Sequence, residues 1–391
     1  MVMQTNKNEL AEVARRFAKP LMQQENLSAQ QIKALHNIVQ CRTASMGGHE
    51  ERCDHCNSVR YSYNSCSDRH CPKCQNTKQA IWVDELMKVT LPIKHYHIIF
   101  TMPHSLNDIC LWNPKMYYNL FFSAVWRTLH SFGYTHYGVE SGAIAVLHTW
   151  GQNLSLHPHI HCLVPAAGFS LKGEWKQLNS KGRFIYPVHQ LSDTFKGKFL
   201  DSLKRKLNKM DMPKAFAGHI EKAYQPPWVV NSQPSMAGAE HVIRYLGQYT
   251  HRIAISNQRI LNISDTHVTF IAKDYRDNAM QKKVRMHGVE FLRRFCTHVM
   301  PKRFVRIRRY GIYHPTTIKN LDLQFVPEQK PQIQDLQKEK ETSAERIKRL
   351  TGFDVVLCKK CNKGRMYVKR EIPRIRSPSG HLPSLLISMI Y

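Results

Sequence analysis

Acidic residues are scarce in this chain of 391 residues, which has 29 Asp and Glu against 57 Lys and Arg. A surface with a net charge of +28 repels itself, so the expected partner is a polyanion. Nucleic acid fits best because each neutralised phosphate releases counterions, and the alternatives are ribosome association or a generally adhesive surface. The apolar fraction of 42% excludes a disordered basic tail and predicts a folded core.

Long apolar runs are also missing. No window approaches the roughly 18 apolar residues of a membrane span, and MVMQTNKNEL at the start has no apolar signal core. We therefore expect a cytoplasmic protein without a membrane partner. The eleven cysteines then favour metal binding over disulfides.

Local patterns predict a mixed chain. Residues 1–40 look helical, with Ser28 capping AQQIKALHNIVQ. KHYHIIFTMP reads as a strand, and the runs 142–151 and 159–165 read as a hairpin with a longer connection. Helices are predicted over the ranges 116–132, 193–210 and 239–253, and a linker or exposed helix over 327–349.

Four cysteines form the pattern C-x2-C-x14-C-x2-C: Cys53, Cys56, Cys71 and Cys74. Two such pairs suit one tetrahedral Zn²⁺ with four thiolates, which has no open position and is therefore structural. Four nearby residues could complete a second zinc site: Cys41, His49, Cys66 and His70. Alternatively, Cys66 and His70 could replace a member of the first site. The pair Cys358 and Cys361 cannot fill a tetrahedral site alone, so we expect no metal there.

Two histidines, His159 and His161, alternate along a predicted strand and therefore share a face. They could grip one divalent ion, with His148 as the expected third ligand and His157 as the alternative. Such an ion keeps open positions and can act as a Lewis acid on a phosphate. The other interpretation is a histidine-rich strand whose rings are satisfied by hydrogen bonds.

Tyr245 and Tyr249 are one helical turn apart in a predicted helix, so both phenols would point into the same space. Tyrosine can serve as a covalent nucleophile, although such pairs more often pack in a core. Between 281 and 310 the chain is strongly basic and should bind the phosphate backbone, unless it is only a solvated face. The candidate contacts there are Arg293, Arg294, Lys302, Arg306, Arg308 and Arg309.

Five motifs in this order resemble the two-tyrosine transposases of the insertion sequence ninety-one type, in the HUH (His-hydrophobic-His) class. They are SCSDRHCPKCQ, FTMPHSL, HTWGQNLSLHPHIHCLV, YLGQYTHRIAISNQRI and HVMPKRFVRIRRYG, and the resemblance covers roughly residues 30–315. The chain departs from the family pattern at Arg303, where a glycine is expected, and fits it poorly after residue 350.

The resemblance implies an α+β protein with a ferredoxin-like HUH nuclease core, an antiparallel sheet with helices. It implies Mg²⁺ or Mn²⁺ at His159 and His161, and Tyr245 and Tyr249 as nucleophiles that form 5′-phosphotyrosine intermediates. The resulting division is a helical segment (1–40), a zinc-binding DNA-recognition domain (41–90), a catalytic domain (91–315) and a basic linker and tail (316–391).

The implied activity is rolling-circle DNA transposition in the bacterial cytoplasm, at the nucleoid. Its substrates would be single-stranded DNA at mobile-element ends and target DNA. The chain has no GxxxxGK[ST] phosphate loop, so a host helicase would have to melt the duplex. Two alternatives remain: a plasmid-type replication initiator or relaxase with the same chemistry, and a non-enzymatic zinc-dependent DNA-binding regulator.

Overall fold

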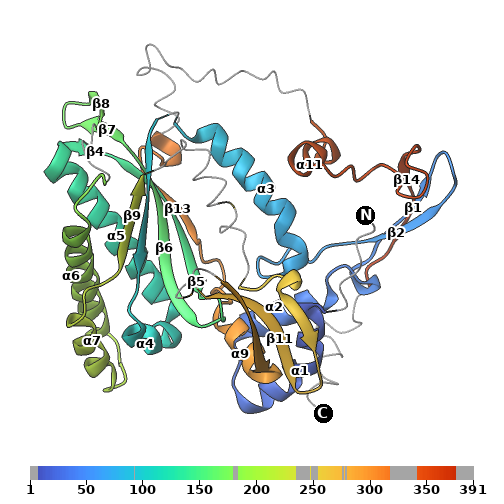
Figure 1. Ribbon diagram of the computed structural model, residues 1–391, viewed down its shortest axis with the longest axis horizontal. Coiled ribbons are helices and arrows are strands. Elements are labelled where there is room, and N and C mark those ends of the chain that lie inside the picture. Colours follow the sequence, from blue (N-terminus) through green and yellow to red (C-terminus); the bar gives the residue numbers. More distant parts are fainter. Residues whose placement is uncertain are drawn as a thin grey trace.

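A five-stranded antiparallel sheet lies at the centre of the protein (Figure 1), in the strand order β13–β5–β6–β3–β9. The computed structural model describes residues 8–91, 93–178, 184–234, 247, 254–274, 277, 280–317 and 341–375. The sheet strands are β3 (His95–Thr101), β5 (Gly142–Trp150), β6 (Leu156–Pro165), β9 (Val230–Pro234) and β13 (Ile307–Gly311). The predicted strand and hairpin are confirmed, with β5 and β6 paired antiparallel.

One face of this sheet carries the largest apolar core. Alternate strand residues such as Ile98, Phe100 and Ile160 are fully buried there. They pack with α5 and α6, whose Phe121 and Phe195 belong to the same core. The helices on this side are α4 (Asn107–Trp112), α5 (Pro114–Tyr137), α6 (Val188–Leu207) and α7 (Phe216–Tyr224). The helices predicted over 116–132 and 193–210 are confirmed.

The helix α5 shows how local sequence sets an element's limits. Pro114 occupies the first turn, where its missing N–H costs nothing, and the Asn113 side chain accepts a hydrogen bond from the Met116 N–H. Gly138 ends the helix in the left-handed region at φ 64°.

The opposite face of the sheet is covered in part by α3 (Pro72–Val89). Leu86 of α3 is buried with Ile144 of β5 and Leu163 of β6, which point to this side of the sheet. Most of the helix predicted over 239–253 lies outside the described residues. Gly247 is described: it is helical and lies against Val83 of α3.

A second hydrophobic core joins the N-terminal helices to the segment between residues 254 and 296. It holds α1 (Leu10–Gln24) and α2 (Ala29–Gln40) against α9 (Gly288–Thr297) and a three-stranded meander. The meander strands are β10 (Ile260–Ile263), β11 (His267–Asp274) and β12 (Met280–His287). Ser28 caps α2 as predicted, and the structure adds a reciprocal capping box with Gln31. The N-terminal helices therefore share their core with residues 254–296.

Two small sheets complete the described part of the chain. One contains β4 (Val139–Glu140), β7 (Ala167–Ser170) and β8 (Trp175–Gln177). The other contains β1 (Gly48–Cys53), β2 (Val59–Tyr63) and β14 (Met366–Ile372), and follows α11 (Ser343–Thr351). The prediction of a linker and tail after residue 316 is therefore wrong for residues 341–375. These residues include a helix and the strand β14, which pairs with β1 from the other end of the sequence.

The predicted α+β class is confirmed: antiparallel sheets are combined with helices and an N-terminal cysteine cluster. Among the described residues, no helix has the length and apolar content needed to cross a membrane.

Arg303, where the family resemblance expects glycine, lies in a turn whose backbone conformation favours glycine. The Phe304 N–H donates to the Pro301 carbonyl, and Arg303 has φ 60°. A positive φ at the third position of a tight turn costs an L-residue about 1–2 kcal/mol.

Replacing Arg303 with glycine should therefore stabilise the fold by about 1 kcal/mol, because glycine adopts this conformation without strain. We expect the thermal-unfolding midpoint to rise by about 1 °C, because the unfolding entropy of a chain of this length is large. Arg303→Ala is the control: it removes the same charge and side chain but keeps the strained φ. An equal rise in both variants would show that the side chain, and not the backbone, is responsible.

Candidate functional site

Three histidines meet on the face of the central sheet that α3 partly covers. His148 of β5 is directly paired with His159 of β6, and Val146 with His161, so all point to the same side. The nitrogen atoms that these three rings offer lie within 4.8 Å of one another. His148 is 4.6 Å from His161 and 5.3 Å from His159, measured between ring centroids.

Hydrogen bonds hold two of these rings. The Nδ1 atom of His159 lies 2.7 Å from the carbonyl oxygen of His157, and Nδ1 of His161 lies 2.9 Å from Nε2 of His97. Since Nδ1 is engaged in both rings, Nε2 is the atom that could coordinate an ion. His97 was not among the residues predicted from sequence; the only sequence signal was that it is a histidine within the predicted strand KHYHIIFTMP.

Burial favours the neutral form of His159, His161 and His97 by lowering their pKa. It lowers the pKa of His159 to about 4 and that of His161 well below its usual range. Burial also lowers the pKa of His97 to about 4. Only a neutral imidazole has a lone pair to offer, so the environment suits metal ligation.

His157, the alternative third ligand, is not a member of this cluster of described residues. Its ring lies 5.2 Å from that of His159 and 5.4 Å from that of His104. The geometry therefore favours His148 over His157.

Tyr245 and Tyr249 lie outside the described residues. Gly247, two positions from each, touches α3 so closely that an added Cβ would lie 2.0 Å from a methyl carbon of Val83. Val83 packs against the apolar cluster that contains Ile144 and Leu163, on the histidine-bearing face of the sheet.

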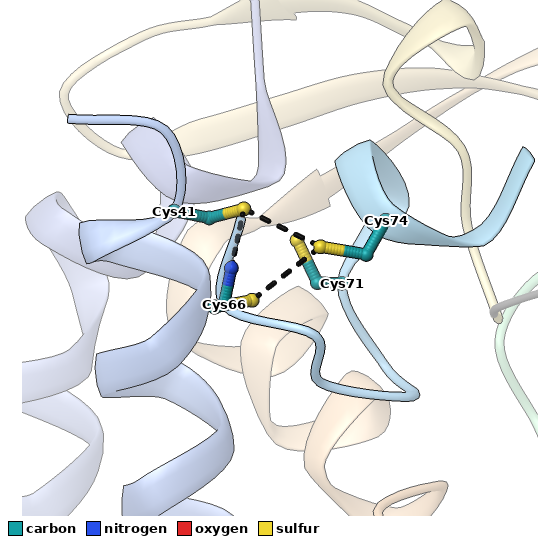
Figure 2. Close-up of side chains that lie close together, drawn as sticks. All are labelled: Cys41, Cys66, Cys71 and Cys74. Carbon is teal, nitrogen blue, oxygen red and sulfur yellow. Dashed lines mark hydrogen bonds between the residues drawn. The ribbon is translucent and has the colours of Figure 1, made fainter. Parts of the chain in front are cut away.

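A cluster of four cysteines lies where α3 begins: Cys41, Cys66, Cys71 and Cys74 (Figure 2). The sulfur of Cys74 is 3.5 Å from that of Cys41 and 3.7 Å from that of Cys66. A tetrahedral zinc with Zn–S bonds of about 2.3 Å needs sulfurs about 3.8 Å apart, so the cluster fits Zn²⁺.

A second cluster of four cysteines combines Cys53 and Cys56 with Cys358 and Cys361. The prediction that Cys53, Cys56, Cys71 and Cys74 share one site is therefore wrong: the chain between the two pairs carries them into different clusters. The expectation that Cys358 and Cys361 lack the partners for a metal site is also wrong. The pairing of β14 with β1 brings these two cysteines next to Cys53 and Cys56.

The two histidines predicted as zinc ligands lie outside both cysteine clusters. His49 is on β1, between Ser62 and Glu371 in the strand register. His70 has its Nδ1 2.9 Å from the Asp68 carboxylate, and its Nε2 accepts the Met300 N–H at 3.1 Å. His70 thus fastens the cysteine segment to the loop after α9.

The predicted phosphate contacts are divided between surface and core. Arg306 is only 9% exposed, so its assignment as a DNA contact is wrong in this structure. Arg293 and Arg294 both pair with Glu290, and Arg308 stacks over the Phe122 ring at 4.1 Å. Lys302 is exposed and Arg309 half-buried.

Three apolar residues alternate with these basic ones. Phe304 and Ile307 pack in hydrophobic cores, and Tyr310 stacks on Trp126.

Two family models match the chain. One, described as a putative transposase, matches residues 142–321, and one described as a transposase zinc-binding domain matches residues 13–102. The zinc-binding match includes Cys41, Cys66, Cys71 and Cys74, which we call the Cys41 cluster, and supports structural zinc.

Two curated proteins are similar along most of the chain. "Putative transposase y4qJ" of Sinorhizobium fredii is 37% identical and aligns with 92% of this chain and 94% of its own length. "Transposase for insertion sequence element IS801" of Pseudomonas savastanoi pv. phaseolicola is 24% identical over 74% of this chain and 72% of its own. No solved structure is significantly similar to the chain.

The contacts of His70 predict a structural role separate from zinc. His70→Ala should leave the zinc content unchanged but destabilise the protein by about 1–3 kcal/mol, because the buried Met300 N–H loses its acceptor. Metal analysis and thermal unfolding measure the two effects, with the exposed His189→Ala as control. Loss of zinc from His70→Ala, as expected for Cys71→Ser, would mean that His70 is a ligand after all.

Proposed function

Since the chain belongs to the transposases of the insertion sequence ninety-one type, we propose that it cuts and rejoins single DNA strands with tyrosine nucleophiles beside a metal ion at His148, His159 and His161. The observation that carries the proposal is the convergence of these three imidazoles on one face of the paired strands β5 and β6.

The histidine cluster fits a divalent cation, Mg²⁺ or Mn²⁺. Its ligand atoms are close together, and burial favours the neutral form of His159 and His161 by lowering their pKa. Hydrogen bonds to His157 and His97 set the orientation of these two rings. Three protein ligands leave coordination positions for oxygen, and an ion bound there supplies Lewis-acid polarisation of the scissile phosphate. His97 positions His161 and does not itself belong to the cluster.

Tyr245 and Tyr249 are the proposed nucleophiles. The phenolic oxygen attacks phosphorus, the bond from phosphorus to the 3′ oxygen breaks, and that oxygen leaves as a 3′-hydroxyl after gaining a proton. The 5′-phosphotyrosine keeps the energy of the broken bond, so rejoining needs no ATP. The contact of Gly247 with α3 supports this assignment, because α3 packs on the histidine-bearing side of the sheet.

The remaining partners follow from charge and from motifs. A net charge of +28 suits DNA at the mobile-element ends and at the target. We propose single-stranded or melted DNA as substrate, with a host helicase opening the duplex, and action at the bacterial nucleoid in the cytoplasm. The Cys41 cluster is proposed to hold a structural Zn²⁺ that anchors the start of α3.

The covalent intermediate can be tested with end-labelled single strands from an element end, incubated with Mn²⁺. A 5′-phosphotyrosine links the protein to the fragment downstream of the cut. A 3′ label should therefore move to a protease-sensitive, slowly migrating species, while a 5′ label should appear on a short free fragment.

The double variant Tyr245→Phe/Tyr249→Phe should abolish this adduct, and His159→Ala/His161→Ala should lower it by about 100-fold or more. Tyr224→Phe, which changes an exposed tyrosine on α7, is the control. Adduct formation by the double phenylalanine variant would remove both tyrosines from the mechanism. Intact binding with no adduct from the unmodified protein would instead favour a regulator.

A further inference from the structure

We propose that Cys53, Cys56, Cys358 and Cys361 hold a second structural Zn²⁺, which joins residues 354–375 to the hairpin of β1 and β2. The two halves of this site are far apart in sequence, with Cys53 and Cys361 separated by 308 positions. In the structure their sulfurs are 3.7 Å apart, and those of Cys56 and Cys358 are 3.8 Å apart. These distances agree with the edge of about 3.8 Å expected for a tetrahedral zinc–thiolate site.

The two cysteine pairs have the same backbone conformation. Each is followed by an asparagine in the left-handed region, Asn57 at φ 56° and Asn362 at φ 54°. The Asn57 N–H donates to the Cys53 carbonyl at 3.2 Å, and the Asn362 N–H donates to the Cys358 carbonyl at 2.9 Å. Two equivalent tight turns therefore direct two sulfurs each toward a common point.

Backbone and side-chain donors face the sulfurs. The His55 N–H lies 3.4 Å from the Cys53 sulfur, and the Gly364 N–H lies 3.3 Å from the Cys361 sulfur. The Ser58 hydroxyl lies 3.3 Å from the Cys358 sulfur. Such donors stabilise the thiolate form that binds metal. The arrangement is that of a ligand set and not of four chance thiols.

The second cysteine cluster has almost no apolar core to hold it together. Its buried apolar residues are Cys53, Cys358 and Met366, with Cys56 and Cys361 packed against them. Three short strands with so little buried area do not fold stably without a further constraint, and a bound metal supplies one.

A second zinc here has a consequence for the rest of the chain. The helix α11, which precedes the Cys358 pair, is held to α3 by ion pairs from Arg346 and Arg349 to Asp84. These arginines and Lys88 hold the pKa of Asp84 near 2, against a rise due to burial. The zinc would fix the C-terminal end of the segment 341–372 at β1, while α11 holds its N-terminal end at α3 (Figure 1).

Metal analysis of the purified full-length protein tests the site directly. We expect two Zn²⁺ per chain, and one in Cys358→Ser/Cys361→Ser. The control Cys110→Ala removes a buried thiol outside both clusters and should keep two. Two zinc ions retained by the double serine variant, or iron in place of the second zinc, would overturn the proposal.

Limited trypsin digestion gives a readout that does not depend on metal counting or on catalysis. Residues 354–375 contain seven Lys and Arg, so loss of the second zinc should expose them and speed cleavage there by about tenfold or more. Cleavage within the central sheet and its helices should stay slow, because among the described residues the second cluster shares no hydrophobic core with that sheet. Unchanged cleavage would show that no metal holds this segment.

An independent observation concerns the outer face of the same three-stranded sheet. We infer that this face, defined by Tyr61, Tyr63 and Tyr367, binds single-stranded DNA; this rests on the proposed function only in that DNA is the substrate. In the strand register Tyr61 pairs with Glu50, Tyr63 with Gly48, and Tyr367 with Arg52. All three tyrosines therefore point to one side, where their exposed fractions are 55%, 36% and 49%.

Charge complementarity identifies the occupant. Residues 354–375 carry seven basic and two acidic residues, and Arg365, Lys369 and Arg370 beside Tyr367 are exposed. Arg370 pairs with Glu50 on the tyrosine side, so its charge is only partly available. Exposed aromatic rings with flanking cations form a stacking platform for unpaired bases, whereas a duplex hides its bases from such rings.

Binding of a fluorescent 20-nucleotide oligothymidylate, without added Mg²⁺ or Mn²⁺, separates this inference from catalysis. Tyr61→Ala and Tyr367→Ala should each weaken binding about tenfold. Tyr61→Phe should bind normally because the ring is kept, and Tyr224→Ala on α7 is the matched exposed-tyrosine control. Unchanged binding in both alanine variants, or equal affinity for a duplex of the same length, would overturn the inference, whether or not the covalent adduct forms.

Discussion

The antiparallel pairing of β5 with β6 is the constraint on which the candidate site depends. This register places His148 opposite His159 and turns His161 to the same side. A shift of one residue would send the histidines of one strand to the opposite face, into the core with α5 and α6. The apolar residues on that opposite face, such as Ile160 and Leu147, hold the register because they are fully buried.

The helix α3 connects the three parts of the molecule that the proposals involve. Its first turn carries Cys71 and Cys74 of one metal-type cluster. Its C-terminal half packs on the histidine-bearing face of the sheet and touches Gly247. Asp84, on the same helix, receives the arginines of α11. The helix α3 therefore contacts the first cysteine cluster, the sheet face and α11.

Much of the fold could be predicted because its signals are local. Ser28 and Gln31 form a capping box within four residues, and the strand and helix of His95–Thr101 and Pro114–Tyr137 follow their own apolar periodicity. The pairing of His148 with His159 was also accessible, since the two runs are joined by a short connection. His97 was missed because its contact with His161 depends on which strand lies beside β6.

By itself, the sequence determined that cysteines come in pairs suited to zinc, that two histidines share a strand face, and that the surface is cationic. Only the tertiary structure decided which pairs share a site, because Cys53 meets Cys361 through the pairing of β1 with β14. It also decided that Arg306 is buried while Lys302 is exposed. Spacing along the chain sets local geometry, whereas the partners of a side chain depend on how distant segments pack.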